Sequence, residues 1–265
     1  MTIWATGANG IIGSKLPQYV KPLIFNSNGI EINMLHQIQS GDTVVHLAAV
    51  VGEAKCKQNP GLATDINVLA VRKLAEQVLS VPNVQLIYAS TGHVYGPANS
   101  PRTESDMTNP QTLYAELKLR GEIEVQKIFS IEKNRLAITR IFSILDRDLT
   151  FDSLTSRVLR ILNNQEDSKI ILNSDDVRDF QTRAEIILML EKVWRLNFEG
   201  VINICSGRPM SVKEACLDFV NKLKIPGAAR ILKFEPGVSA MPYLVGNRGK
   251  LDLLNSPGTF EHRKL

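Results

Sequence analysis

The sequence has 265 residues, 44% of them hydrophobic, so it can bury an α/β core without disulfide or metal cross-links. Its 31 basic and 27 acidic residues are interspersed and give a net charge of +4, which argues against a nucleic-acid-binding protein. Cys56, Cys205 and Cys216 lack the spacing of a disulfide framework or a metal site, and neither an export signal nor a membrane span is recognisable. We therefore expect a cytoplasmic protein with no metal and no membrane partner.

The first half of the chain alternates short apolar runs with longer helical patterns. This alternation predicts parallel strands joined by right-handed crossovers, which is a doubly wound sheet. Strands are predicted at residues 2–6, 23–26, 43–47, 85–90 and 136–142, and helices at residues 63–79 and 111–129.

The first predicted strand runs directly into a glycine-rich loop, which a helical pattern follows. Gly7, Gly10 and Gly13 suit a sharp turn, a close approach of the backbone to pyrophosphate, and packing of a helix on the strand. The amino terminus of that helix would face the phosphates. The alternative is a tight turn without a ligand, but the position after the first strand favours a dinucleotide.

Asn26 ends the second predicted strand, where many dinucleotide-binding proteins place a carboxylate on the adenosine ribose. Its side chain can accept a hydrogen bond from a free 2′-hydroxyl. Nearby hydroxyl, amide and ammonium groups can instead accommodate a 2′-phosphate, namely those of Ser27, Asn28, Lys15 and Lys21. The cofactor is therefore NAD or NADP, with NADP slightly favoured.

Tyr114 and Lys118 are four residues apart on a predicted helix, so they project from one face. A neighbouring ammonium favours the phenolate, which would lower the pKa of Tyr114 toward a value useful for proton transfer. Thr91 follows a predicted strand and is expected at the carboxyl edge of the sheet, where ligands bind. Taken alone, the Tyr–Lys pair favours an ordinary surface pair, and it is Thr91 at the strand end that gives the functional interpretation its weight.

Beyond residue 149 the pattern is more mixed. Helices are predicted at residues 152–162 and 184–196, strands at 170–172 and 201–205, and a loop at 225–241. Ser211 and Glu214 form a capping-box pattern at the start of a further helix. We predict a Rossmann-type α/β domain at residues 1–148, to which later segments can return, and a small substrate-binding α/β lobe at residues 149–265.

Together these motifs resemble the extended short-chain dehydrogenases/reductases of the nucleotide-sugar epimerase and dehydratase group. The resemblance covers most of the chain and is carried by residues 6–13, 42–49, 89–96, 178–180 and 203–207 and by Tyr114 and Lys118. It implies a catalytic triad of Thr91, Tyr114 and Lys118. The implied cofactor-binding residues are Gly7, Asn9, Gly10, Ile11, Ile12, Gly13, Asn26, Leu47, Ala48, Ala49 and Lys118, and the implied substrate-binding residues are His93, Ser143 and Arg178.

Two of the implied substrate residues have a second interpretation. Arg178 is expected near the diphosphate of a nucleotide sugar, but a salt bridge to a nearby acid, Asp175, Asp176 or Asp179, is equally consistent with the sequence. His93 suits a proton donor or base near the sugar, whereas packing outside the site is the favoured alternative.

Departures from the family pattern narrow the expected activity. Gly92 and His93 replace the Asp–Glu pair that 4,6-dehydratases of this group carry, which disfavours a dehydratase, and the segment around Ser143 alters the substrate pocket. The compact chain resembles reductases of 4-keto-6-deoxy sugars. We expect NAD(P)-dependent hydride transfer at a carbon, favoured as carbon 4, of a nucleoside-diphosphate sugar, by a reductase or an epimerase. The alternatives are a non-catalytic NAD(P)-binding regulatory subunit and a reductase of a non-sugar carbonyl; the sequence also allows a homodimer that pairs through the Tyr114 helix.

Overall fold

The computed structural model describes residues 1–146, 153–165, 170–237 and 239–254. Among these residues, six parallel strands form the central sheet in the order β11-β7-β6-β5-β1-β2. The strands are β1 (Ile3–Thr6), β2 (Lys21–Leu23), β5 (Thr43–His46), β6 (Gln85–Thr91), β7 (Leu136–Ile141) and β11 (Gly200–Ile204). The predicted doubly wound α/β fold is confirmed.

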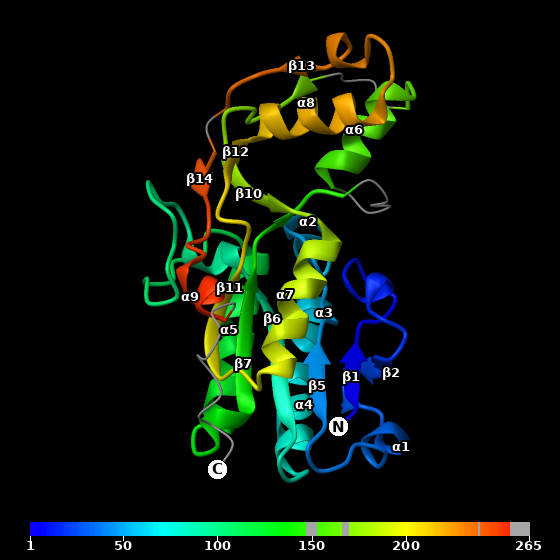
Figure 1. The fold of residues 1–265 in the computed structure, drawn as a ribbon, viewed down its shortest axis with the longest axis vertical. Helices are drawn as coiled ribbons and strands as arrows, with labels where there is room; N and C mark the ends of the chain where they lie inside the picture. The colour runs from blue at the N-terminus through cyan, green and yellow to red at the C-terminus, as the bar shows by residue number, and fades with distance from the viewer. Residues whose placement is uncertain (147–152, 166–169, 238, 255–265) are drawn as a thin grey trace.

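Helices cover both faces of the sheet, which explains why β1, β5 and β7 are buried along their whole lengths. α4 (Ala70–Leu79) and α5 (Leu113–Ile128) cover one face, and α7 (Arg183–Arg195) covers the other (Figure 1). Successive strand residues alternate between the two cores. Trp4, Val44 and Leu86 pack toward α4 and α5, whereas Ile3, Val45 and Ile87 pack toward α7.

The helix predicted after the glycine-rich loop is absent from the described residues. The chain forms only the 3₁₀ turn η1 (Gly13–Lys15) before β2 begins. Pro17 explains the early end, since a proline disfavours the helical conformation of the residue before it, and Leu16 is extended with a ψ of 147°. Ile12 and Leu16 instead pack against the core that α7 covers.

The second predicted strand divides into two. β2 joins the central sheet, whereas β3 (Phe25–Asn26) pairs antiparallel with β4 (Gly29–Ile30) as a separate hairpin. Gly29, with a φ of +89°, follows Asn28 at the turn, a residue pair typical of tight hairpins. The short helix α1 (Ile32–Leu35) then leads toward β5.

The helical segment before β6 is interrupted by a π turn. It comprises α2 (Glu53–Gln58), α3 (Pro60–Thr64), the π-helical η2 (Asp65–Leu69) and α4. Asn67 in the π turn accepts the Val50 N–H at 2.8 Å and donates to the Val50 carbonyl at 2.9 Å. The π turn thereby holds the loop that follows β5.

A second lobe lies beyond the carboxyl ends of the strands (Figure 1). Its core lies between α6 (Leu154–Leu162) and α8 (Val212–Leu223) and includes Val158 and Phe219. The other elements are β8 (Ser143–Ile144), β9 (Ile170–Ile171), β10 (Val177–Gln181), β12 (Pro209–Ser211), η5 (Ala228–Arg230), β13 (Lys233–Phe234) and β14 (Tyr243–Leu244). The capping box of Ser211 and Glu214 is confirmed.

The later predictions agree with the described elements to within a residue or two at each end. The predicted loop at residues 225–241 also contains η5 and β13, and residue 152 lies outside the described residues. The boundary at residues 148–149 lies outside them as well, so the domain division stays a prediction. β11 nevertheless pairs with β7, and Leu251 of α9 (Gly249–Leu253) packs in the α7 core.

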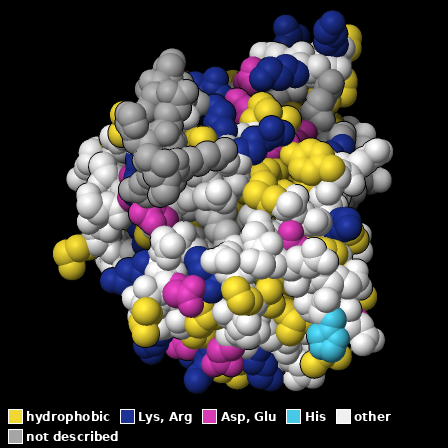
Figure 2. All heavy atoms as spheres, turned by 60° about the horizontal axis from the view of Figure 1, so that its bottom comes forward, with side chains coloured by type: hydrophobic (Ala, Val, Ile, Leu, Met, Phe, Trp, Pro, Cys, Tyr) yellow, Lys and Arg dark blue, Asp and Glu magenta, His cyan; other side chains and the backbone are white. Residues whose placement is uncertain are grey.

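The surface carries mixed charge. Figure 2 shows acidic, basic and hydrophobic side chains intermixed over the face it presents. No helix among the described residues has the length and apolar character that crossing a membrane requires.

Candidate functional site

The strand order reverses between β1 and β5, and the candidate site lies at the carboxyl ends of these strands, where open α/β sheets bind ligands. Gly7 has a φ of +70° and approaches the chain after β5 so closely that an added Cβ would lie 2.7 Å from the Ala48 nitrogen. A Cβ on Gly13 would overlap the Gly7 carbonyl. Glycine is therefore required at both positions by packing as well as by any ligand.

The loop fits a dinucleotide phosphate even though no long helix follows it. The Gly10 N–H donates to the Gly7 carbonyl at 2.8 Å, which closes the turn. The backbone N–H groups of Ile11 and Ile12 have no acceptor among the described residues. Unpartnered N–H groups on a glycine turn form an anion-binding concavity. The turn thus offers the N–H donors that the sequence analysis expected from the amino terminus of a helix.

The end of β5 forms the opposite wall. The Thr6 hydroxyl lies 2.8 Å from Nδ1 of His46 and accepts the Ala48 N–H at 3.3 Å, which ties β1 to the chain that leaves β5. Leu47, Ala48 and Ala49 are half-buried at this wall, and their role toward a cofactor stays a prediction.

At the ribose end, Asn26 is exposed, and its side-chain oxygen accepts the Asn28 N–H at 2.8 Å. Lys73 of α4 also reaches this hairpin, and the sequence analysis missed it. Lys21 lies elsewhere, because its Nζ is 5.1 Å from the Trp4 ring, toward the amino ends of the strands. A 2′-phosphate contact from Lys21 is therefore not supported.

Thr91, Tyr114 and Lys118 come together at the end of β6. Thr91 is the last residue of this strand, and its side chain lies close enough to Tyr114 to lower the pKa of the phenol. The Thr112 side chain caps α5, and the Tyr114 N–H donates to Oε2 of Glu53 at 3.1 Å. Two side chains therefore hold the first turn of this helix in place. Lys118 lies one turn further along, 3% exposed, with Nζ 4.2 Å from the centre of the Tyr88 ring.

Burial governs the ionisation of this pair. It lowers the pKa of Lys118 to about 7, against the opposing charge of Glu122. Burial also raises the pKa of Tyr114 above its ordinary value, as does the nearby Cys56 thiol, whereas the Thr91 hydrogen bond lowers it. The direction is opposite to the sequence expectation, because desolvation is the largest cause and the Lys118 ammonium is not among the causes. Tyr114 is therefore a protonated phenol, ready to donate.

Glu122 is a further buried charge that the sequence analysis missed. It lies one turn beyond Lys118, accepts the Ser90 hydroxyl at 2.5 Å, and pairs with Nε and Nη2 of Arg140 at 3.1 and 2.7 Å. These bonds fasten α5 to β6 and β7 beside Lys118. The repeated spacing of four residues from Tyr114 through Lys118 to Glu122 was the available signal.

The three predicted substrate residues lie on the side of the second lobe. His93, in the 3₁₀ turn η3 (Gly92–Tyr95), is half-buried, and burial together with the charge of Arg178 lowers its pKa to about 4. Arg178 donates from Nη2 to Asp176 at 2.8 Å, so the salt bridge is present. Ser143 is half-buried on β8, opposite Phe180. Their roles toward a substrate stay predictions.

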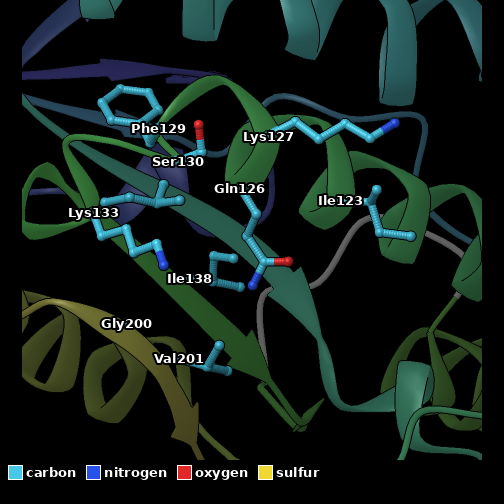
Figure 3. A pocket seen from close by; sticks show the side chains of 10 residues that line it. Ile123, Gln126, Lys127, Phe129, Ser130, Lys133, Ile138, Gly200 and Val201 are labelled. Atoms are coloured by element: carbon cyan, nitrogen blue, oxygen red, sulfur yellow. The ribbon is translucent and has the colours of Figure 1, made fainter.

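A separate hollow of about 530 Å³ lies outside this site, between the carboxyl-terminal half of α5 and the β7–β11 edge (Figure 3). Ile123, Gln126 and Lys127 line it from α5, and Val201 lines it from β11. No sequence-predicted site residue contributes to it.

The chain is similar to several known proteins. The model of the RmlD substrate binding domain matches residues 1–178. Methionine adenosyltransferase 2 subunit beta from Bos taurus is 30% identical over 106 residues, which are 40% of this chain and 31% of that protein. The match thus spans about a third of the length of this curated relative.

Solved structures are similar over nearly the whole chain. RMD from Pseudomonas aeruginosa, complexed with NADPH, is 18% identical with a TM-score of 0.75 and covers 95% of this chain and 91% of its own. UDP-N-acetylglucosamine 4-epimerase from Methanobrevibacter ruminantium is 19% identical with a TM-score of 0.80, and the match covers 96% of this chain and 92% of that one. A dTDP-4-dehydrorhamnose reductase from Clostridium acetobutylicum is 22% identical with a TM-score of 0.77, and the match covers 97% of this chain and 93% of that one. At these sequence identities the similarity shows a shared fold and nothing finer.

Proposed function

Because the chain belongs to the RmlD substrate binding domain family, we propose that it is an NAD(P)-dependent reductase of a nucleoside-diphosphate 4-keto-6-deoxy sugar. The observation that carries the proposal is the meeting of Thr91 and Tyr114 beside the buried ammonium of Lys118 at the carboxyl edge of the sheet. The similar solved structures include both a reductase and a 4-epimerase, so the direction of the chemistry rests on this chain's own residues.

The glycine-rich loop would hold the cofactor diphosphate with the N–H groups of Ile11 and Ile12, and Lys118 would hold the nicotinamide ribose. When bound, the nicotinamide supplies the hydride that the carbonyl carbon accepts. Lys118 Nζ has no hydrogen-bond acceptor among the described residues, so it is available for the ribose hydroxyls.

Tyr114 then supplies the matching proton. Its phenol donates to the carbonyl oxygen as that oxygen becomes a hydroxyl, and Thr91 donates a hydrogen bond to the same oxygen. The phenolate left on Tyr114 is stabilised by the ammonium of Lys118, one turn away. A tyrosine whose pKa is raised by burial favours this direction, because an epimerase must begin by removing a proton.

Arg178 would bind the diphosphate of the substrate on the side of the second lobe, where a guanidinium can pair with two phosphate oxygens. His93, close enough for the charge of Arg178 to lower its pKa, would be neutral at pH 7 and would contact the sugar as a hydrogen-bonding group. Ser143 would complete this side.

The test is an assay of cofactor oxidation. The protein is mixed with NADPH or NADH and a panel of nucleoside-diphosphate 4-keto-6-deoxy sugars, and the near-ultraviolet absorbance of the reduced cofactor is followed. We expect bleaching with at least one sugar, and a loss of rate of about 10²-fold or more in Tyr114→Phe with the affinity for cofactor retained. Tyr19→Phe, an exposed tyrosine bonded to Glu191, is the matched control and should retain its rate.

Interconversion of two sugars without net cofactor oxidation would identify an epimerase instead. Unchanged turnover in Tyr114→Phe would contradict the proposed role of the triad.

A second candidate is a cofactor-binding subunit without turnover. The similarity to methionine adenosyltransferase 2 subunit beta favours it, since that protein is named as a subunit. Tight binding of NADPH or NADH together with no turnover across the sugar panel would support this candidate. The retained Thr91, Tyr114 and Lys118 favour the enzyme, because a binding subunit has no need of a proton donor.

A further inference from the structure

Lys73 connects helix α4 to the β3–β4 hairpin, where the adenosine ribose of a cofactor is expected. The sequence analysis assigned no functional residue to this helix. The Nζ of Lys73 donates to the Ser27 carbonyl at 3.1 Å and to Oδ1 of Asn28 at 3.3 Å. Ser27 and Asn28 form the tip of the β3–β4 hairpin, which follows the second strand of the sheet. In doubly wound dinucleotide-binding folds the adenosine ribose lies at this position.

The hairpin is held in place at both of its strands. Gln77, one turn beyond Lys73, accepts the Ile30 N–H at 2.7 Å and donates to the Ile30 carbonyl at 2.9 Å. The Phe25 ring packs edge-on against His46 with ring centres 4.6 Å apart, and His46 is bonded to Thr6 at the end of β1. The tip therefore has a defined position beside the strand that carries the glycine-rich loop.

The chemistry at the tip suits a phosphate. Asn26, Ser27 and Asn28 present no carboxylate, the group that would bind a free 2′-hydroxyl and repel a 2′-phosphate. An ammonium has three N–H donors, of which two are directed to the hairpin, so Lys73 retains one. Among the described residues the Ser27 hydroxyl and the Asn26 amide nitrogen have no partner, so both can donate as well.

We propose that Lys73, together with Ser27, binds the 2′-phosphate of NADP and makes this chain selective for NADP over NAD. The proposal rests on the proposed cofactor-dependent function and deepens it. Lys73 is exposed, so its contribution is a charge-assisted hydrogen bond in a solvated site.

The test uses two probes that differ only in the phosphate, namely ADP-ribose and 2′-phospho-ADP-ribose, with binding measured by isothermal titration calorimetry at low ionic strength, where exposed charges are least screened. We expect the wild-type protein to bind the phosphorylated probe about tenfold to a hundredfold more tightly, as a charge-assisted hydrogen bond allows. Lys73→Gln should lose most of this difference while its affinity for ADP-ribose is unchanged.

Arg72→Gln is the matched control. Arg72 is the preceding residue of the same helix, and its guanidinium is directed to Glu76 and Glu124. This variant removes one positive charge from α4 but should discriminate between the probes as the wild-type protein does.

The alternatives give different results. Equal binding of both probes by the wild-type protein, or unchanged discrimination in Lys73→Gln, would overturn the proposal. If Lys73 only holds the hairpin, Lys73→Gln will weaken both probes alike. If neither probe binds the wild-type protein, the dinucleotide site itself is wrong, a failure distinct from loss of selectivity alone.

Discussion

At the scale of single residues, Lys118 combines a buried position with a group that can carry a charge. Its ammonium is almost completely buried, which costs free energy, and the Tyr88 ring and the Glu122 carboxylate offset only part of that cost. A charge retained at this expense is typical of a functional group. The proposed function gives this charge a role beside Tyr114, one turn away.

Lys118→Met should therefore separate stability from activity. The pKa of Lys118 falls from 10.5 in the unfolded chain to about 7 in the folded protein, so the lysine opposes folding below pH 7 and this penalty disappears as the pH rises toward 10.5. We expect urea denaturation to show equal or greater stability for the variant at pH 6.5, with a gap to wild type that narrows by pH 9. Turnover should fall about 10²-fold.

Lys127→Met is the control for this comparison, because Lys127 is an exposed residue of the same helix. It should show neither the pH-dependent gap nor the loss of turnover. A Lys118→Met variant that is less stable at every pH would contradict the view that the buried ammonium is tolerated for function.

At the scale of elements, packing alone already requires the glycines of the glycine-rich loop. Gly13 opens η1 and lies directly against the backbone of Gly7 and Ala8. Since these neighbours are backbone atoms, a side chain at Gly13 cannot be accommodated by rotating another side chain. The turn at Gly7 and Ala8 must move instead.

Gly13→Ala should therefore destabilise the protein by about 1–3 kcal/mol, the usual cost of overpacking, and weaken dinucleotide binding. Gly61→Ala is the matched substitution, since Gly61 lies in α3 and a Cβ there would come no closer than 3.8 Å to a neighbour. Alanine is the better helix former, so this control should keep or raise stability. Chemical denaturation measures both, and equal stability of the two variants would contradict the role assigned to Gly13.

The predicted helices and strands agree with the structure in most places and differ in two. Apolar periodicity predicted the strands at residues 43–47 and 85–90 and the helix at 111–129 to within two residues at each end. It missed the absence of a helix after Gly13 and the division of residues 23–26 into β2 and β3. In both cases the sequence contains a local signal, Pro17 in one and the Asn28-Gly29 turn in the other.

At the scale of the whole molecule, the two lobes are joined by buried polar contacts. The Asp179 carboxylate, on β10, accepts hydrogen bonds from Ser206, Gly207 and Gly246. The segment around Arg178 thus includes a buried structural carboxylate, Asp179, beside the candidate phosphate ligand. The family resemblance expected from the motifs is confirmed.

Acid stability is a property of the whole fold that follows from buried imidazoles. Burial, with the charge of Lys118, lowers the pKa of His46 to about 3 from 6.5, so the ring is neutral in the folded protein and takes up a proton on unfolding below pH 6.5. Stability contributed by the neutral ring is therefore lost as the pH falls from 6.5 toward 3. His46 alone should cost about 2 kcal/mol between pH 7 and pH 5.

Urea denaturation across this pH range checks the expectation. His46→Gln should be less stable at pH 7 but show a shallower fall toward pH 5, whereas His36→Gln, at an exposed position, should follow the wild-type protein. A wild-type stability that is constant from pH 7 to pH 5 would show that the folded protein accommodates a charged His46.

The sequence by itself determined the fold class and the glycine-rich turn after the first strand, because periodicity and glycine spacing are encoded in neighbouring residues, and the family resemblance implied the grouping of Thr91, Tyr114 and Lys118. Only the tertiary structure decided that Lys73 meets Ser27, that Glu122 pairs with Arg140, and that the pKa of Tyr114 is raised. These facts depend on which distant segments pack together and on how much water that packing removes, and neither can be read from residues close in the chain.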